Sequence, residues 1–274
     1  MNFIEKFLNF ISTRGNTPNS FGLYHLICVV FVVVITFLFC KFFRKKGDRT
    51  VRKLLLICWI IMFIFELYKQ AAFAFEYNNG DPYMDIKWYI FPFQLCSTPL
   101  YVLPLIVFLK DSKVRDALIA FNSTFALFGG LVVFVYPNDV FTSIIGINIQ
   151  TMVHHGIQIL TGIFLLVRYK DKLNLNYLLK GSVVFAITFV IAMILNEVVY
   201  ATVISKGTDI SFNMFYISRH FECHLPILNV IYTNVPYIVF LLVYFLGFVF
   251  IAFLILQITN LIIKLIGRKK YVTE

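Results

Sequence analysis

Residues 21–53 read FGLYHLICVVFVVVITFLFCKFFRKKGDRTVRK and place a long apolar run directly before a cluster of basic residues. The apolar run, roughly 21–43, is long enough to cross a bilayer as a helix, which takes about 20 residues. The basic cluster that follows is typical of a short loop on the cytoplasmic side of a membrane. This stretch therefore predicts a span that runs inward, and the rest of the chain repeats the pattern.

The composition indicates an integral membrane protein. Of the 274 residues, 60% are hydrophobic and 14% are charged, and the mean hydropathy is +0.83. Soluble domains carry about 25% charged residues. The formal net charge of +10 comes mainly from short loops, so we interpret the basic residues as orientation signals and expect no nucleic-acid partner.

Seven apolar runs predict an all-α bundle of seven transmembrane helices. These runs cover roughly residues 21–43, 51–75, 91–109, 116–136, 148–167, 177–204 and 235–265. Pro92, Pro99 and Pro104 predict a kink in the third run. Before the first run, apolar residues at helical spacing from Phe3 to Ile11 predict a short amphipathic helix on the membrane surface.

The predicted bundle forms one domain over residues 1–274, with an interfacial segment at 1–20, the helices at 21–265 and a cytoplasmic tail at 266–274. Most of the 24 basic residues follow the first, third, fifth and seventh runs. The positive-inside rule then predicts an outside N-terminus and a cytoplasmic C-terminus. We therefore expect a multi-pass protein of the cell membrane.

Polar and reactive groups interrupt the apolar runs towards the predicted outer side. Such groups are costly to place in hydrocarbon, and by default they indicate a functional site. In this orientation four spans and the loop at 205–234 contribute them, so we expect a water-accessible cavity in the outer half. The groups are Glu66, Lys69, Glu76, Gln94, Cys96, His154, His155, Asn196, Glu197, Arg219, His220, Cys223 and His224.

The groups inside the predicted spans 51–75, 91–109 and 148–167 have two possible interpretations. Glu66 and Lys69 share a helix face, where they either bind a charged headgroup or form an ion pair that only serves packing. Cys96 lies among polar residues and is either a thiolate nucleophile or a small apolar filler. His154 and His155 point about 100° apart on a helix, so at most one is expected to face Cys96. Alternatively, both are hydrogen-bonded interfacial histidines.

Two further motifs carry weaker signals. His220, Cys223 and His224 give a spacing that zinc accepts, but no second Cys/His pair accompanies them, so we expect no metal and no other cofactor. Gly129 and Gly130 follow no strand and precede no Lys-Ser/Thr, so they favour close helix packing over phosphate binding.

Three motifs together resemble a known family. They are Pro92-Phe-Gln-Leu-Cys96, then Phe125-Ala-Leu-Phe-Gly-Gly-Leu through Tyr136-Pro-Asn-Asp139, then His154-His155-Gly156. Their order and spacing resemble the bacterial YwaF-type integral membrane family, which is distantly related to animal transmembrane protein 164. Gln94 stands where a histidine is often expected, and the stretch from Arg219 to His224 is not a pattern of that family.

The animal relatives are regarded as lipid acyltransferases that use a Cys/His pair. The resemblance therefore implies Cys96 as nucleophile and His154 or His155 as base. The leading hypothesis is an acyltransferase that acts on phospholipid or another membrane lipid from the extracytoplasmic side by covalent catalysis. The predicted substrate-binding residues are Glu66, Lys69, Gln94, Asn196, Glu197 and Arg219.

Two alternatives remain open at the level of sequence. The first is a transporter or substrate-binding protein that uses the outward-facing polar groups without a reactive cysteine. The second is a non-enzymatic membrane protein that binds a partner, whose identity the sequence does not indicate.

Overall fold

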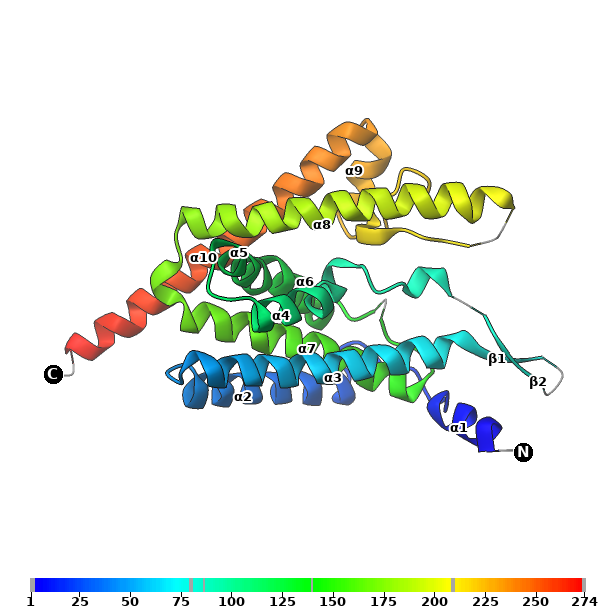
Figure 1. Cartoon of the computed structure of the whole chain (residues 1–274), viewed down its shortest axis with the longest axis horizontal. Helices are drawn as coiled ribbons and strands as arrows, with labels where there is room; N and C mark the ends of the chain where they lie inside the picture. The colour runs from blue at the N-terminus through cyan, green and yellow to red at the C-terminus, as the bar shows by residue number, and fades with distance from the viewer. Residues whose placement is uncertain (1–2, 79–80, 86, 139, 208–209, 273–274) are drawn as a thin grey trace.

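The computed structural model describes residues 3–78, 81–85, 87–138, 140–207 and 210–272, and these residues are mostly helical (Figure 1). The helices are α1 (Phe3–Ile11), α2 (Leu23–Phe43), α3 (Asp48–Ala74), α4 (Pro99–Phe108), α5 (Lys113–Phe121), α6 (Leu127–Val135), α7 (Ile145–Arg168), α8 (Leu175–Thr202), α9 (Leu228–Asn234) and α10 (Tyr237–Val272). Strands β1 (Phe75–Asn78) and β2 (Asp81–Met84) form an antiparallel hairpin in which Phe75 pairs with Met84.

Within the described residues, five helical segments are long and apolar enough to cross a membrane. They are α2, the segment Lys113–Val135 that contains α5 and α6, α7, α8 and Tyr237–Ile266 of α10. A helical, multi-pass membrane protein is therefore confirmed. The predicted runs at 51–75 and 91–109 are not among the five.

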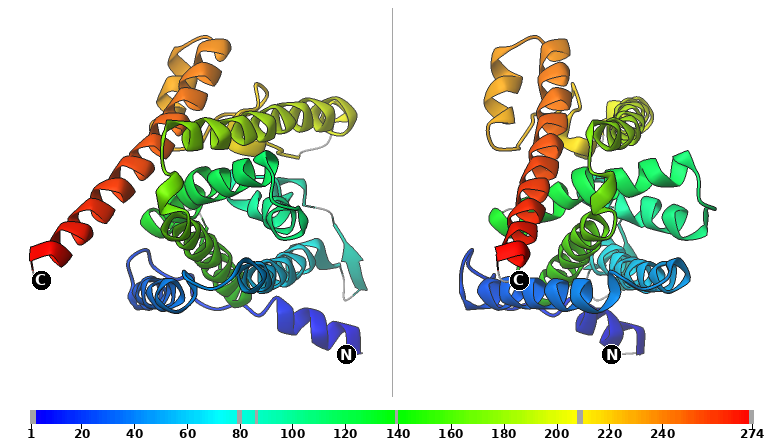
Figure 2. Two further views of the ribbon diagram at one scale, coloured as in Figure 1. Left: turned by 60° about the vertical axis from the view of Figure 1, so that its left-hand side comes forward. Right: turned by 90° about the vertical axis from the view of Figure 1, so that its left-hand side faces the viewer.

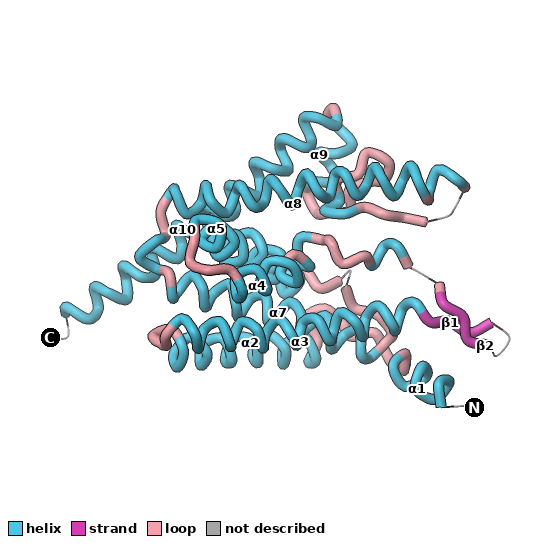
Figure 3. The backbone as a smooth tube through the Cα atoms, in the orientation of Figure 1, coloured by secondary structure: helices cyan, strands magenta, loops and turns pink. Residues whose placement is uncertain are grey.

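The run at 91–109 does not form one long helix. The chain passes through an irregular stretch and a 3₁₀ turn at Leu95–Ser97 before α4 begins at Pro99. Proline lacks a backbone N–H and clashes with the preceding turn, so Pro92 and Pro99 prevent a continuous helix. Figure 3 shows this irregular stretch, and the connection from α8 to α9, towards the end of the bundle that carries the hairpin.

Helix α7 lies at the centre of the bundle. It packs against α2, α3 and α6, and Figure 2 shows it between the α2–α3 pair and the group formed by α4, α5 and α6. In its most apolar window 78% of the residues are buried, against 17% in α2. Polar side chains on α7 are therefore held inside the protein, whereas α2 mostly exposes apolar ones.

A glycine pair brings α6 close to its neighbours. A Cβ atom at Gly129 would lie 3.4 Å from the backbone nitrogen of Cys96 and 3.3 Å from Nε2 of Gln158. At Gly130 it would lie 3.1 Å from the carbonyl oxygen of His155. These glycines therefore place the Cys96 segment, α6 and α7 in direct contact, in agreement with the packing role predicted from the sequence.

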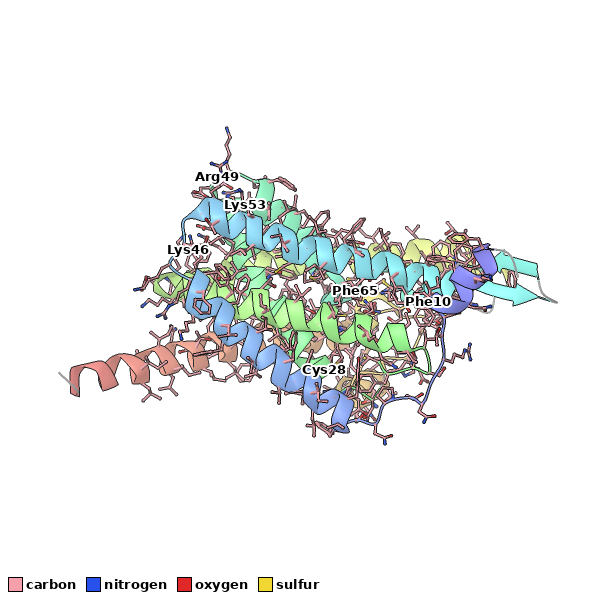
Figure 4. The ribbon with its side chains drawn as sticks, turned by 90° about the horizontal axis from the view of Figure 1, so that it is seen from below. Phe10, Cys28, Lys46, Arg49, Lys53 and Phe65 are labelled. Atoms are coloured by element: carbon pink, nitrogen blue, oxygen red, sulfur yellow. The ribbon has the colours of Figure 1, made fainter. Side chains whose placement is uncertain are left out.

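A helix before the first apolar run and a basic end of the bundle were both predicted from the sequence, and the structure has both. Helix α1 buries Leu8 and Ile11, and its carbonyl at Ile11 accepts a 2.6 Å hydrogen bond from Tyr68. Figure 4 shows Lys46, Arg49 and Lys53 at one end of the bundle and Phe10 at the other. The predicted tail at 266–274 begins as helix, because α10 continues to Val272, and residues 273–274 lie outside the described part.

Candidate functional site

Cys96 sits where the chain changes from an irregular segment into α4. The 3₁₀ turn at Leu95–Ser97 holds it half-buried, and the hydroxyl of Thr98 closes the turn by donating to the carbonyl of Leu95 at 2.7 Å. The side chain of Ser97 lies beside the Cys96 thiol. Because the chain forms no continuous helix here, the Cys96 thiol lies next to polar groups.

The two histidines of α7 have different partners. His154 Nε2 is 3.0 Å from the carbonyl oxygen of Cys96, whereas His155 Nδ1 is 2.8 Å from the carbonyl of Thr151 in its own helix. Their ring centroids are 5.3 Å apart. His154 is therefore the histidine that contacts the Cys96 segment, and His155 lies beside it with its hydrogen bond inside α7.

Helix α3 adds an ion pair to this group. Lys69 Nζ is 2.9 Å from Glu66 Oε1, and Gln70 Nε2 donates to the same oxygen at 2.7 Å. Glu66 and Lys69 lie within electrostatic range of both Cys96 and His155. We call Glu66, Lys69, Cys96, His154 and His155 the Cys96 cluster. The side chain of Glu76 lies outside the described part of the structure.

The Cys96 cluster is enclosed and incompletely hydrogen-bonded. His154 and His155 are 2% and 8% exposed, so the expected water-accessible cavity does not open onto these histidines. Glu66 Oε2, His154 Nδ1 and His155 Nε2 are buried and have no hydrogen-bond partner among the described residues. Proteins rarely leave buried polar atoms unpaired, so these three atoms are available to a bound molecule.

Gln94 and Asn196 hold an inserted segment of the loop between α8 and α9. Gln94 donates from Nε2 to the carbonyl of Asn213 at 2.8 Å and accepts at Oε1 from the N–H of Phe215 at 2.7 Å. Asn196 donates from Nδ2 to the Met214 carbonyl at 3.0 Å and accepts at Oδ1 from the Met214 N–H at 2.7 Å, so it clamps the backbone there. Both amides are used on the backbone, so the geometry gives them an anchoring role beside the predicted substrate-binding role.

The anchored segment is buried although it belongs to a loop. Met214 and Phe215 are 0% and 1% exposed, and the ring of Phe215 stacks on Phe93, close to Cys96 in sequence. Phe215 and Tyr216 have φ values of 58° and 57°, which is a strained conformation for bulky residues. Such strain persists only where surrounding contacts enforce it, and here the two clamps do so.

Glu197 and Arg219 form a separate group. Glu197 Oε2 lies 2.8 Å from Arg219 and 3.2 Å from His220, whose ring stacks on Tyr200. Within the described ranges, no hydrogen bond or ion pair links this group to the Cys96 cluster. The exposed position of Arg219 places it at the surface rather than in the cluster.

The stretch from His220 to His224 is not arranged as a metal site. Among the residues that the structure describes, no three His, Cys, Asp or Glu side chains are placed to hold a metal ion. Cys223 is 2% exposed, and burial raises the pKa of its thiol. A thiol in that state is a weaker nucleophile at neutral pH.

Residues 20–258 match the model of the TMEM164 family. The chain belongs to the TMEM164 family. The match covers every candidate site residue from Glu66 to Arg219. No curated protein and no solved structure matches the chain. Membership therefore supports a membrane protein and leaves its activity to be inferred from the site.

One buried histidine of this TMEM164-family protein was not singled out from the sequence. His25, on α2, is 0% exposed, and its Nδ1 accepts a hydrogen bond from the backbone N–H of Phe21 at 3.2 Å. Rings of Phe21, Phe134 and Phe141 surround it. Its isolation in an apolar run was the available signal, and its contacts indicate that it stabilises the turn before α2.

Proposed function

We propose that this TMEM164-family protein is a membrane acyltransferase that acts on phospholipid or a related lipid, with Cys96 as nucleophile and His154 as base. The observation that carries the proposal is the contact between His154 Nε2 and the Cys96 carbonyl at 3.0 Å, beside a buried Glu66–Lys69 pair. Covalent acyl transfer is favoured where a thiol nucleophile, an imidazole base and a cation lie together in an enclosed site.

The proposed reaction has two steps. In the first, the histidine removes the Cys96 proton, the thiolate attacks an ester carbonyl of the lipid, and the lysolipid alkoxide leaves with that proton. In the second, the histidine removes a proton from an acceptor hydroxyl, which attacks the thioester and releases Cys96 as a thiolate that recovers the proton. Each step conserves the acyl group and the proton.

The site must rearrange slightly for this chemistry. The His154 ring now contacts the Cys96 carbonyl rather than the thiol, and catalytic hydrogen bonds are often misaligned in ligand-free enzymes. We propose that bound lipid displaces the carbonyl contact and brings the ring to the thiol. The Nε2 atom of His155 has no hydrogen-bond partner among the residues that the structure describes, and it is the alternative base.

The remaining predicted residues take supporting roles in this proposal. Lys69 holds the lipid phosphate, with Glu66 fixing its position by the 2.9 Å ion pair. Gln94 and Asn196 keep the segment around Met214 over the site. The exposed pair of Glu197 and Arg219 contacts headgroups at the surface.

We further propose seven spans with an outside N-terminus, in the cell membrane. Helix α3 has 27 residues and is therefore about 40 Å long, enough to cross a bilayer. The segment Leu95–Phe108 is apolar and would complete its crossing with the irregular stretch before it. The closer resemblance to YwaF-type bacterial proteins stays a prediction.

The proposal is tested by lipid analysis of cells that carry single variants. Cys96→Ala and His154→Ala are expected to reproduce the lipid acyl profile of the gene deletion, because each removes a reacting group. Cys58→Ala is the matched control, since Cys58 is a buried thiol of α3 outside the Cys96 cluster. Wild-type profiles in Cys96→Ala cells, against a clear change on deletion, would contradict the proposal.

A transporter is the second candidate, favoured by the unpaired Oε2 atom of Glu66 in a buried site. In that case Glu66→Gln abolishes function while Cys96→Ala leaves it intact. The lipid experiment therefore separates the two candidates. A non-enzymatic, partner-binding protein would tolerate both changes.

A further inference from the structure

A line of neutral polar side chains leads away from the Cys96 cluster through the middle of the bundle. On α7, Gln158 follows His155 by three residues and Thr161 follows Gln158 by three, so the three lie near one another along the helix. All three are buried, and Gln158 and Thr161 are 0% exposed. We call His155, Gln158, Thr161, Asn122, Ser123 and Tyr177 the polar track.

Two hydrogen bonds join the π-helical turn that contains Asn122 and Ser123 to α7 on one side and to the start of α8 on the other. Asn122 Nδ2 lies 3.5 Å from Thr161 Oγ1, and the adjacent Ser123 Oγ lies 2.7 Å from Tyr177 Oη. Tyr177 belongs to the first turn of α8, directly after the basic connection Lys170–Lys172. The track thus runs from the Cys96 cluster to the opposite, basic end of the bundle.

The backbone is altered where the track changes helix. Residues Asn122–Ala126 form a π-helical turn between α5 and α6. Such turns are rare and are frequently found at functional sites. Within this turn Asn122 lies against α7 and its neighbour Ser123 lies against α8.

Three of the six members of the polar track have a buried atom without a partner in the described structure. They are Nε2 of His155, Oε1 of Gln158 and Oδ1 of Asn122. Buried polar atoms in proteins are rarely left unpaired, so three of them on one track indicate a bound ligand. The nitrogen of Gln158 is already used, because it donates to the Ala126 carbonyl at 2.6 Å.

The chemistry of these atoms selects the ligand. They belong to two amides and one imidazole, and Glu66, the carboxylate of the Cys96 cluster, is paired with Lys69 through Oε1. In the ranges that the structure covers, no cluster of three ionisable ligands is placed for a metal ion. Water is the ligand that neutral donors and acceptors bind in protein interiors, usually through about three hydrogen bonds.

We propose that the polar track binds a file of ordered water molecules, which connects the Cys96 cluster with Tyr177 across the bundle. This inference does not depend on acyl transfer by Cys96. It requires only that water occupies the positions next to the unpaired atoms.

X-ray hydroxyl-radical footprinting of the full-length protein in micelles tests the proposal, because bound water itself generates the radical beside it. Phe125, in the π-helical turn, and Tyr177 are expected to be oxidised several-fold faster than Phe240 of α10. All three are nearly fully buried, at 1%, 4% and 0% exposure, so access to bulk water does not distinguish them. Oxidation of Phe125 and Tyr177 as slow as that of Phe240 would overturn the proposal.

A pair of threonine variants adds a second test. Thr161→Val removes a hydroxyl of the track, and Thr188→Val removes a hydroxyl of α8 that likewise bonds a carbonyl of its own helix, at 2.9 Å. Thr161→Val is expected to slow oxidation of Tyr177 several-fold, and Thr188→Val to leave it unchanged. Equal effects of the two variants would contradict a continuous file through Thr161.

Discussion

The two ends of the bundle both carry charged clusters, and these differ in how completely their groups are paired. At the basic end, Arg115 bonds Asp48, Asp111 and a backbone carbonyl, and Arg52 bonds the same two carboxylates. We call these four residues the basic-end cluster. In the Cys96 cluster, by contrast, three buried atoms have no hydrogen-bond partner within the described part of the chain. The comparison indicates that the first cluster stabilises the fold, whereas the second has the unpaired atoms that the proposed function assigns to a ligand.

The largest expected effect on stability follows from breaking the basic-end cluster. The side chain of Arg115 is 6% exposed and joins α3, α4 and α5. Arg115 donates three charge-assisted hydrogen bonds, each of which contributes about 1 kcal/mol, so Arg115→Met should lower the free energy of unfolding by about 3 kcal/mol. The measurement is reversible unfolding in mixed micelles.

Lys172→Met is the control for this change, because its ion pair with Asp116 is half exposed at the lysine, at 53%. Exposed pairs contribute about 0–1 kcal/mol, so the control should be nearly neutral. Equal losses in the two variants would show that the basic-end cluster is not the stabilising unit.

A smaller loss is expected where the glycine pair supports the Cys96 cluster. A Cβ at Gly130 would lie 3.1 Å from the His155 carbonyl, and overpacking of this kind costs about 1–3 kcal/mol. Gly130→Ala should therefore lower the melting temperature and reduce lipid turnover together. Gly247→Ala, in α10 with nothing within 4 Å of the added carbon, should do neither.

The smallest effect on stability is expected within the Cys96 cluster itself. His155→Phe removes an unpaired buried nitrogen and one hydrogen bond to Thr151. Because these two changes oppose each other, the free energy of unfolding should stay within about 1 kcal/mol of the wild-type value. If His155→Phe destabilised the protein as strongly as Arg115→Met, the contrast between the two clusters would be lost.

Sequence patterns predicted most of the long helices, but not the interruption of the run at 91–109, and they predicted that Cys96, His154 and Lys69 lie towards one end of the bundle. Residues on one helix share a face by spacing alone, and charged residues mark the helix ends. The contact of Arg115 with Asp48, 67 residues earlier, was not predictable in this way. It depends on how three helices pack, and spacing along one helix does not determine that.

Two features of the site also required the structure. The π-helical turn at Asn122–Ala126 packs against α7 and α8, and hydrophobic spacing along the chain does not predict the extra residue of such a turn. Phe215 lies beside Phe93 because Gln94 and Asn196 hold the backbone around it by hydrogen bonds. Gln94 is 121 residues from Phe215 in the chain, and Asn196 is 18 residues from Met214. Polar residues in apolar runs predicted several of the side chains that gather in the candidate site, but not which residues each of them contacts.

Mass spectrometry of the purified protein is the direct test of whether Cys96 carries the acyl group. After incubation with phospholipid, we expect an acyl adduct on Cys96 that hydroxylamine removes. The adduct should be absent in Cys96→Ala, retained in Cys58→Ala and strongly reduced in His154→Ala. Lipid turnover with Cys96 unmodified throughout, or undiminished in Cys96→Ala, would contradict the account.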